Sequence, residues 1–354
     1  MSDKGGKRMF VVSSSPHIRH PESIPRVMWT VFGLLLGPAV AGCLYFGRNA
    51  TGSFNLWPIF IIVCSVLAAI ATEALILRLR GKDVKRALDG SAAVTGMLFG
   101  LVISPHVPWY VVVTGAVVAV GVGKHLFGGL GHNIWNPALV GRAFVLMAWA
   151  SAMTGQWPLP GQPDVVSQPT PLMAAKTAKA LGWLGKGSIV NHLFVGSVPG
   201  SLGETSALVI LLAGIFLILF KYIDWRVPLI YIVTTVVLCM LIPYRESADW
   251  FRKLSFWEEM GFWAFSGGLF LGAFFMATDM VTSPITPKGR VIFALGCGVL
   301  TAVIRKMGGY PEGVCYSILI MNTCVPLIDR FTKPRRFGTV TFYEPPAAQA
   351  DAAS

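Results

Sequence analysis

The segment "LWPIFIIVCSVLAAIATEALIL", residues 56–77, decides the fold class. It carries one acid, Glu73, and it is long enough to supply the roughly 20 residues with which a helix crosses a bilayer. The chain as a whole contains 54% hydrophobic and 13% charged residues, and this charged share is about half of that in soluble domains. Both observations predict an integral membrane protein whose spans are helices.

Further apolar runs lie on both sides of this segment. Together they predict ten transmembrane helices in an all-α protein. Several runs are short or interrupted by glycine, which is unusual for simple spans. The ten runs are 27–46, 56–77, 88–103, 108–123, 134–151, 206–220, 226–243, 261–278, 290–304 and 313–329.

The lysines and arginines predict the orientation of these spans. If the chain crosses the membrane at each apolar run, every second connecting segment lies on the same side. Most of the 29 lysines and arginines fall in one such set of segments, and the positive-inside rule makes that side cytoplasmic. This rule also accounts for the net charge of +12, so no nucleic-acid partner is expected. The predicted parts are a cytoplasmic N-terminal segment (1–26), a first membrane repeat (27–151), an external loop (152–205), a second membrane repeat (206–330) and a cytoplasmic C-terminal tail (331–354).

The two halves of the chain echo each other. "ISPHVP" (103–108) matches "TSPITP" (282–287), and "HLFGGLGHN" (125–133) matches "RKMGGYPEG" (305–313) at nearly the same offset. Chance similarity of Ser-Pro and Gly-Gly loops is the alternative explanation. Because each half has an odd number of predicted spans, a true repeat would be inverted, which is typical of transporters. We then expect the two Ser-Pro breaks to line one shared cavity.

Four longer motifs resemble one known family. They are "SSSPHIRHPESIPRVMWTV" (13–31), "GGLGHNIWNPALVGRAF" (128–144), "DVVSQPTPL" (164–172) and "DMVTSPITPKGR" (279–290). In this order they are similar to the RnfD subunit of the Rnf complex and to its sister, the NqrB subunit of the Na⁺-translocating NADH:quinone oxidoreductase. The resemblance implies ten spans in two inverted five-helix repeats, an architecture similar to that of urea transporters. The short N-terminal extension favours the Rnf type over its sister.

The same resemblance implies a covalent FMN on Thr170. Members of the family attach FMN to a threonine through a phosphoester, and Asp164, Ser167 and Thr170 match the attachment motif. Gln168 and Pro169 depart from the Gly-Ala pair of that motif. We expect the two flanking prolines to hold the hydroxyl out for modification, whereas an unmodified proline-rich turn is the alternative reading.

Other polar residues have two or three interpretations each. Asn133, Asn136 and Arg142 near a span start suit a flavin pyrimidine or a phosphate, or they act as polar contacts between helices. Asp279 and Thr282 serve ion passage, bind a second flavin (riboflavin in the family), or cap a helix. No histidine or cysteine spacing indicates a metal site.

The expected function is therefore that of a redox subunit in an ion-translocating ferredoxin–NAD oxidoreductase, and not of a stand-alone enzyme. The chain contains no dinucleotide fingerprint and no cluster ligands, so other subunits, including an external flavoprotein and membrane partners, are expected to handle NAD and ferredoxin. The alternatives are the NqrB subunit of the quinone reductase and a urea-transporter-like channel. The expected location is the bacterial cytoplasmic membrane, with both termini cytoplasmic and the Thr170 loop outside.

Overall fold

The computed structural model describes residues 22–48, 54–154, 169–177, 188–242, 249–308 and 313–333. Within these ranges the chain is helical, and its only β-type pairing is one isolated bridge between Arg48 and Phe54. The all-α prediction is confirmed for this part of the chain. Asp164 and Ser167, two residues of the predicted attachment motif, lie outside the described residues.

Each of the ten apolar runs coincides with a helix or with a helix pair. Four described helices (α1, α2, α14 and α15) are long and apolar enough to cross a membrane by themselves, and a pair bent by 58°, α12 with α13–η3, gives a fifth candidate. The remaining apolar helices have 10–17 residues. The chain is therefore a multi-pass helical membrane protein, built largely from short and broken helices. The bounds are α1 Ile24–Gly47, α2 Trp57–Leu79, η1 Val84–Leu88, α3 Ser91–Leu101, α4 Trp109–Val118, η2 Ala119–His125, α5 Pro137–Ala148, α6 Ala150–Thr154, α7 Pro171–Lys176, α8 Ile189–Val195, α9 Ala207–Leu219, α10 Arg226–Leu241, α11 Asp249–Arg252, α12 Phe256–Phe265, α13 Leu269–Leu271, η3 Gly272–Met276, α14 Pro287–Met307 and α15 Val314–Phe331.

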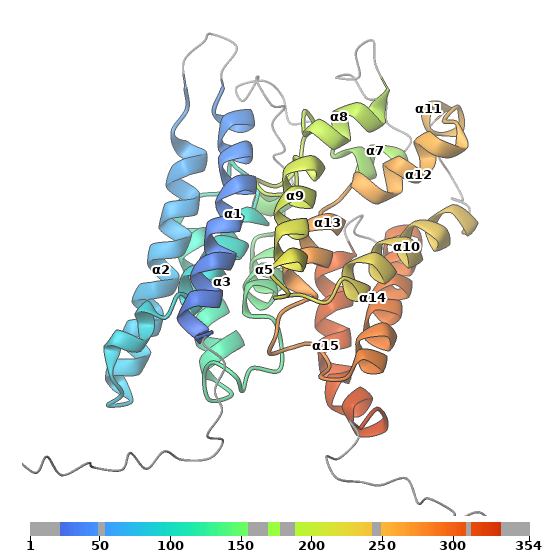
Figure 1. Ribbon diagram of the computed structural model, residues 1–354. Coiled ribbons are helices and arrows are strands. Elements are labelled where there is room, and N and C mark those ends of the chain that lie inside the picture. Colours follow the sequence, from blue (N-terminus) through green and yellow to red (C-terminus); the bar gives the residue numbers. More distant parts are fainter. Residues whose placement is uncertain are drawn as a thin grey trace, which may run out of the picture.

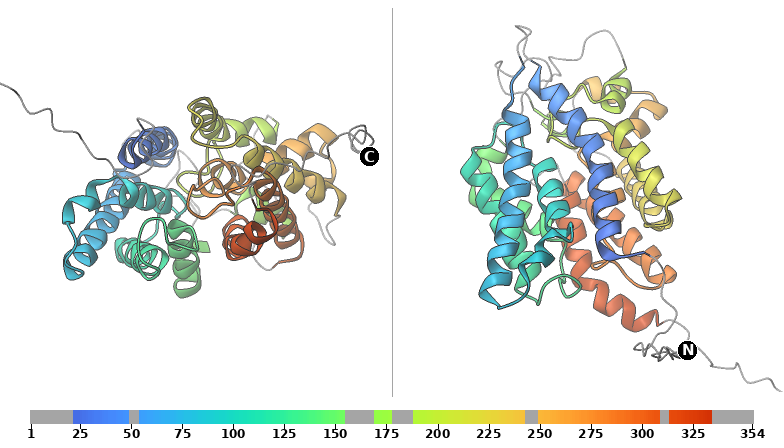
Figure 2. Two further views of the ribbon diagram at one scale, coloured as in Figure 1. Left: turned by 60° about the horizontal axis from the view of Figure 1, so that its bottom comes forward. Right: turned by 60° about the vertical axis from the view of Figure 1, so that its left-hand side comes forward.

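The helices of the first half lie beside those of the second half (Figures 1 and 2). In Figure 1, α1 begins and α15 ends at the lower end of the molecule, whereas α7, α8, α11 and α12 lie at the upper end. The described ends of the chain thus share one face, and α7, which follows Thr170, lies at the opposite face. This relative placement agrees with the predicted arrangement of the termini and the loop.

Two short helices occupy equivalent places in the two halves. All residues of α3 are buried, and so are all residues of the continuous helix Leu269–Met276. Each begins after a glycine in the left-handed region, Gly90 with φ 89° and Gly268 with φ 67°. A side chain at such a φ would be strained, so glycine lets the chain turn sharply into each half-helix.

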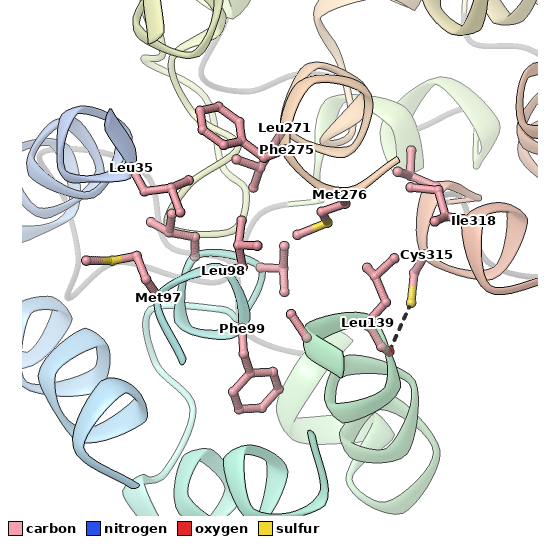
Figure 3. Packing of buried hydrophobic residues seen from close by; sticks show 14 of the residues in the cluster. Leu35, Met97, Leu98, Phe99, Leu139, Leu271, Phe275, Met276, Cys315 and Ile318 are labelled. Carbon is pink, nitrogen blue, oxygen red and sulfur yellow. Dashed lines mark hydrogen bonds between the residues drawn. The ribbon is translucent and has the colours of Figure 1, made fainter. Parts of the chain in front are cut away.

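The apolar centre of the molecule forms where these two half-helices meet. Figure 3 shows Leu98 of α3 on the side of Phe275 and Met276 of η3, whereas Phe99 points away from them, and all four belong to one buried cluster. The close approach of α4 to α3 depends on Gly115 of α4, since a Cβ there would overlap the ring of Phe99 of α3. A second buried cluster underlies the upper end, where α7 packs with α8 and α12.

Candidate functional site

Thr170 lies at the start of α7, in a sheltered position. Its hydroxyl oxygen accepts a hydrogen bond from Met173 N at 3.3 Å, and the residue is 7% exposed. The expectation that the prolines hold this hydroxyl out is wrong. Pro171 starts a helix that its fixed φ favours, and the following apolar residues bury this helix in the upper cluster, which draws Thr170 inward.

A small cavity opens beside Thr170, with a volume of about 20 Å³. Its wall includes Glu204 and Thr205 from the segment before α9, together with Gly267 at the bend between α12 and α13. The hydroxyl of Thr205 is buried and has no hydrogen-bond partner in the described part of the chain. An unpaired buried hydroxyl is costly, so this cavity suits a polar ligand group.

Arg142 reaches this upper region from α5. Its guanidinium donates to Glu204 Oε1 at 3.0 Å, and both side chains are buried. The predicted site residue Arg142 is therefore brought to the Thr170 cavity and is separated from the two asparagines of its own motif. The pairing also neutralises the Glu204 carboxylate at the cavity wall.

Lys176 ends α7 on the same side of the molecule. Its ammonium donates to the carbonyl oxygen of Gly308 at the end of α14, which ties α7 to the second half. Burial lowers the pKa of this ammonium group.

A second and larger cleft lies at the opposite end, beside the start of α1. It has a volume of about 90 Å³, and its wall contains Asn133, Asn136 and Asp279. Asp279 accepts hydrogen bonds from Val281 N at 3.4 Å and from the Thr282 hydroxyl at 3.1 Å. These contacts lie in the turn between η3 and α14, and the N-cap of α14 is Thr286, so Asp279 caps no described helix. It holds a turn in the wall of the cleft. The cleft wall includes neither Ser104 nor Pro105, so this cleft is not the expected cavity shared by both Ser-Pro breaks.

Of the two asparagines, Asn136 is joined to the second half, both directly and through Asn322. Asn136 Nδ2 donates to Met276 O at 3.2 Å, while Asn133 leaves its buried Oδ1 without a partner among the described residues. The Asn322 amide, oriented to satisfy both of its ends, donates to Thr282 O and accepts from Asn136 N, each at 3.1 Å. Two predicted motifs from opposite halves therefore meet at one residue that was not predicted.

A buried ion pair forms another part of the cleft wall. Lys124 Nζ donates to both Glu73 carboxylate oxygens at 2.7 Å and to Ser91 Oγ at 2.6 Å, so all three of its donors are used. Lys124 is 1% exposed and Glu73 is 3% exposed. The sequence singled out Glu73 as an acid inside a span, but Lys124 was only counted as a basic residue of a cytoplasmic loop. The sequence did contain a signal for this ion pair. It was a lysine soon after an apolar run, in a half of the chain that also holds an acid inside a span.

The fold and the two sites define the class of protein. The chain is a multi-pass membrane protein with a cavity at each end, each with some polar groups in a mainly apolar wall, and a buried apolar centre between them. The model of the NQR2, RnfD, RnfE family matches residues 11–338. The chain therefore belongs to this family.

Similar proteins cover nearly the whole chain. The D subunit of the proton-translocating ferredoxin:NAD(+) oxidoreductase complex of Clostridium ljungdahlii is 42% identical over 338 residues, which is 94% of this chain and 97% of that protein. The D subunit of the Na(+)-translocating ferredoxin:NAD(+) oxidoreductase complex of Acetobacterium woodii is 41% identical over 93% of this chain and 95% of that protein. The D subunit of an ion-translocating oxidoreductase complex of Stutzerimonas stutzeri is 38% identical over 89% of this chain and 92% of that protein.

Proposed function

We propose that the chain is the RnfD-type membrane subunit of an ion-translocating ferredoxin–NAD oxidoreductase complex. The observation that carries this proposal is the near full-length similarity to the D subunits of such complexes. A cavity at each end of the helices, with a mainly apolar wall and a few polar groups, suits a subunit that binds electron carriers on both sides of a membrane. The chain works with the other subunits of the complex, among them an external flavoprotein, in the bacterial cytoplasmic membrane.

The cavity beside Thr170 is the proposed place of a covalent FMN. The Thr170 hydroxyl would carry the flavin through a phosphoester, and Thr205 offers an unpaired hydroxyl on the same wall. The flavin supplies electron transfer when it is attached. The protein holds its stem and sets its electrostatic surroundings.

The cleft at the opposite end is the proposed place of a second, non-covalent flavin such as riboflavin. A flavin pyrimidine edge has both donors and acceptors, and the wall offers the Asp279 carboxylate and the unpaired Asn133 Oδ1 as acceptors, whereas the donors of Lys124 are already used by Glu73 and Ser91. Asn136 is held by its own hydrogen bonds and shapes the wall. A role of Asp279 in ion passage is compatible with this placement, because an ionisable group at membrane depth is commonly functional.

The proposed topology has ten spans in two inverted repeats, with both termini in the cytoplasm and Thr170 outside. Two buried half-helices that each follow a left-handed glycine support the repeat, as does their placement in opposite halves. The positions of α1, α7 and α15 in Figure 1 support the relative sidedness.

Cysteine labelling in intact cells tests this topology. A cysteine replacing the exposed Thr177 at the end of α7 is expected to react with an impermeant thiol reagent added from outside. A cysteine replacing the exposed Lys82 beyond α2 is expected to react only after the cells are opened. The unmodified chain, with its six native cysteines, serves as the background. The reverse pattern would move Thr170 and its flavin to the cytoplasmic side.

Purification of the complex through a tag on this chain tests the proposed function. The purified assembly is expected to contain the other subunits and to reduce NAD⁺ with reduced ferredoxin, without added quinone. A tagged chain that brings down an NADH:quinone reductase would assign it to the sister type instead, since the family model covers both types. Recovery of the chain alone from mild detergent, with no redox activity, would favour the channel alternative.

A further inference from the structure

A basic segment, residues 78–89, connects the end of α2 to the start of α3. It contains the last residues of α2 and the whole of η1, and every residue from Arg78 to Arg86 is exposed. Because α2 is long and apolar enough to cross a membrane, the segment that follows it lies at the edge of the bilayer. Five of its residues are basic: Arg78, Arg80, Lys82, Lys85 and Arg86.

Four of these five cations have no partner within the described residues. Arg80 is the exception, since its guanidinium donates to the carbonyl oxygen of His125 at 2.7 Å. The other four side chains form no ion pair and no hydrogen bond in the part of the chain that the structure describes. The basic segment therefore presents several free positive groups on one short stretch of surface.

The charges around the basic segment do not neutralise it. Its two carboxylates, Asp83 and Asp89, accept hydrogen bonds from nearby backbone N–H groups at 3.0 and 2.8 Å and form no ion pair in the described chain. Five basic and two acidic residues leave the segment with a net charge of +3. The neighbouring charges on other elements balance each other: Lys124 with Glu73, and Arg26 with Glu22 at the start of α1.

Exposed apolar side chains lie among these cations. Leu79 is 77% exposed and Leu88 is 65% exposed. Trp29 of α1, itself exposed, donates from its indole nitrogen to the carbonyl oxygen of Leu88 at 3.3 Å. An exposed tryptophan near the end of a spanning helix is typical of the membrane–water interface. The contact with Trp29 therefore places the basic segment at the level of the lipid headgroups.

The positive-inside rule explains the basic residues of this segment but not its leucines. A connection that lies in water gains nothing from exposed Leu79 and Leu88. At the interface, by contrast, leucine enters the acyl boundary while lysine and arginine reach the headgroups. An acidic protein surface would also neutralise the cations. The lipid is favoured over it, because headgroups are present at this level of the membrane.

We infer that the basic segment is a binding site for the headgroups of anionic phospholipids. The lipid phosphate accepts hydrogen bonds from Lys82, Lys85 and Arg86, and the exposed leucines lie against the upper part of the acyl chains. A cluster of basic residues directly after a membrane span is a general form of site for anionic lipids. The proposed topology assigns these lipids to the cytoplasmic leaflet, whereas the chemistry of the site is independent of that assignment.

The basic segment is tied to the start of α3, so bound lipid is expected to stabilise the fold. Asp89 accepts from Ser91 Oγ at 2.6 Å, and Ser91 begins α3 in the wall of the lower cleft. Lys124 donates to the same hydroxyl, and Arg80 holds the carbonyl of the next residue, His125. Headgroups that hold the basic segment in place therefore also hold the first turn of α3 and the ion pair behind it.

Thermal unfolding in detergent micelles tests this site. The full-length chain is purified in a non-ionic detergent, and either phosphatidylglycerol, which is anionic, or phosphatidylcholine, which is zwitterionic, is added. Phosphatidylglycerol is expected to raise Tm by about 2–4 °C, whereas phosphatidylcholine and inorganic phosphate are expected to have little effect. The rise is expected to shrink when the salt concentration goes from about 0.1 M to about 1 M, since salt screens exposed charges.

A triple variant, Lys82→Gln, Lys85→Gln and Arg86→Gln, assigns the effect to the basic segment. Each basic residue near an anionic surface contributes roughly a fivefold factor in binding, so the variant is expected to need at least about tenfold more phosphatidylglycerol for the same rise. Without lipid its Tm is expected to match the wild type, because all three side chains are exposed and unpaired in the described chain.

A second triple variant is the matched control: Lys288→Gln, Arg330→Gln and Lys333→Gln. It removes the same number of lysines and arginines from exposed positions at the same end of the molecule, near the start of α14 and the end of α15. This control is expected to respond to phosphatidylglycerol as the wild type does. An equal loss in both variants would overturn the site, since the effect would then depend on total charge alone.

Other results would also overturn the inference. One is an equal rise with both lipids, and another is a wild-type rise that salt does not change; both are measured without any variant. A third is an unchanged response in the first triple variant. If that variant instead loses other subunits in lipid-free detergent and keeps its lipid response, the basic segment is a protein contact. None of these readouts involves flavin or electron transfer, so the proposed function stands or falls separately.

Discussion

Thr170→Ala is expected to abolish the flavin fluorescence of the denatured chain on a gel. The change removes the only oxygen in the side chain through which a phosphoester can form, so the loss should be complete. Thr170 combines the predicted attachment position with a position in the wall of the adjoining cavity. Ultraviolet illumination of the denatured chain checks this result, because denaturation releases any flavin that is not covalently bound.

Thr170 also caps α7, so the variant needs a control for stability. Loss of an N-cap hydroxyl costs about 0.5–2 kcal/mol. Thr177→Ala removes another hydroxyl next to the same short helix, one that is exposed and donates to Met173 O, and it is expected to keep full fluorescence. Both variants are expected to insert into the membrane in normal amounts. Fluorescence that survives in Thr170→Ala would place the flavin on another residue.

Lys124→Met is expected to lower the free energy of unfolding by about 3–5 kcal/mol, the usual cost of removing one partner from a buried ion pair. The substitution leaves the Glu73 carboxylate at 3% exposure without its cation and frees Ser91 Oγ from its contact with Lys124. The change is measured as the fall in Tm of the chain in detergent. We also expect weaker retention of non-covalent flavin, because Lys124 lines the lower cleft.

A double-mutant cycle separates the pair from its surroundings. Glu73→Met alone is expected to destabilise the chain strongly, whereas the double variant is expected to recover much of the loss, since no buried charge of the pair then remains unpaired. Lys85→Met, a change of the same kind at an exposed position, is expected to leave Tm nearly unchanged. Additive losses in the double variant would mean that Lys124 and Glu73 act independently.

The sheltered position of Thr170 has a consequence for its modification. A hydroxyl that is 7% exposed and bonded to Met173 N cannot be reached by a second protein in this arrangement. On the proposed attachment, the start of α7 has to be open when the flavin is added, either before α7 packs against α8 and α12 or through local opening. α7 has only six residues, which makes local opening inexpensive.

The membrane class, the helical content and the position of every apolar run were readable from the sequence, because hydrophobic run length depends on local composition. The repeat was predicted from matching motifs and stays a prediction, with which the half-helices that follow Gly90 and Gly268 are consistent. The resemblance identified the family that the comparisons show.

The partners of the buried polar groups could be assigned only from the tertiary structure. Lys124 and Glu73 lie 51 residues apart, and Arg142 and Glu204 lie 62 residues apart. Only the tertiary structure likewise shows that Asn322 joins Asn136 to Thr282 and that Thr170 packs inward. Composition and periodicity show that a segment is buried, but a charge or an amide is satisfied by whichever helix packs beside it. That neighbour is set by the close approach of helices distant in sequence, and no local pattern records it.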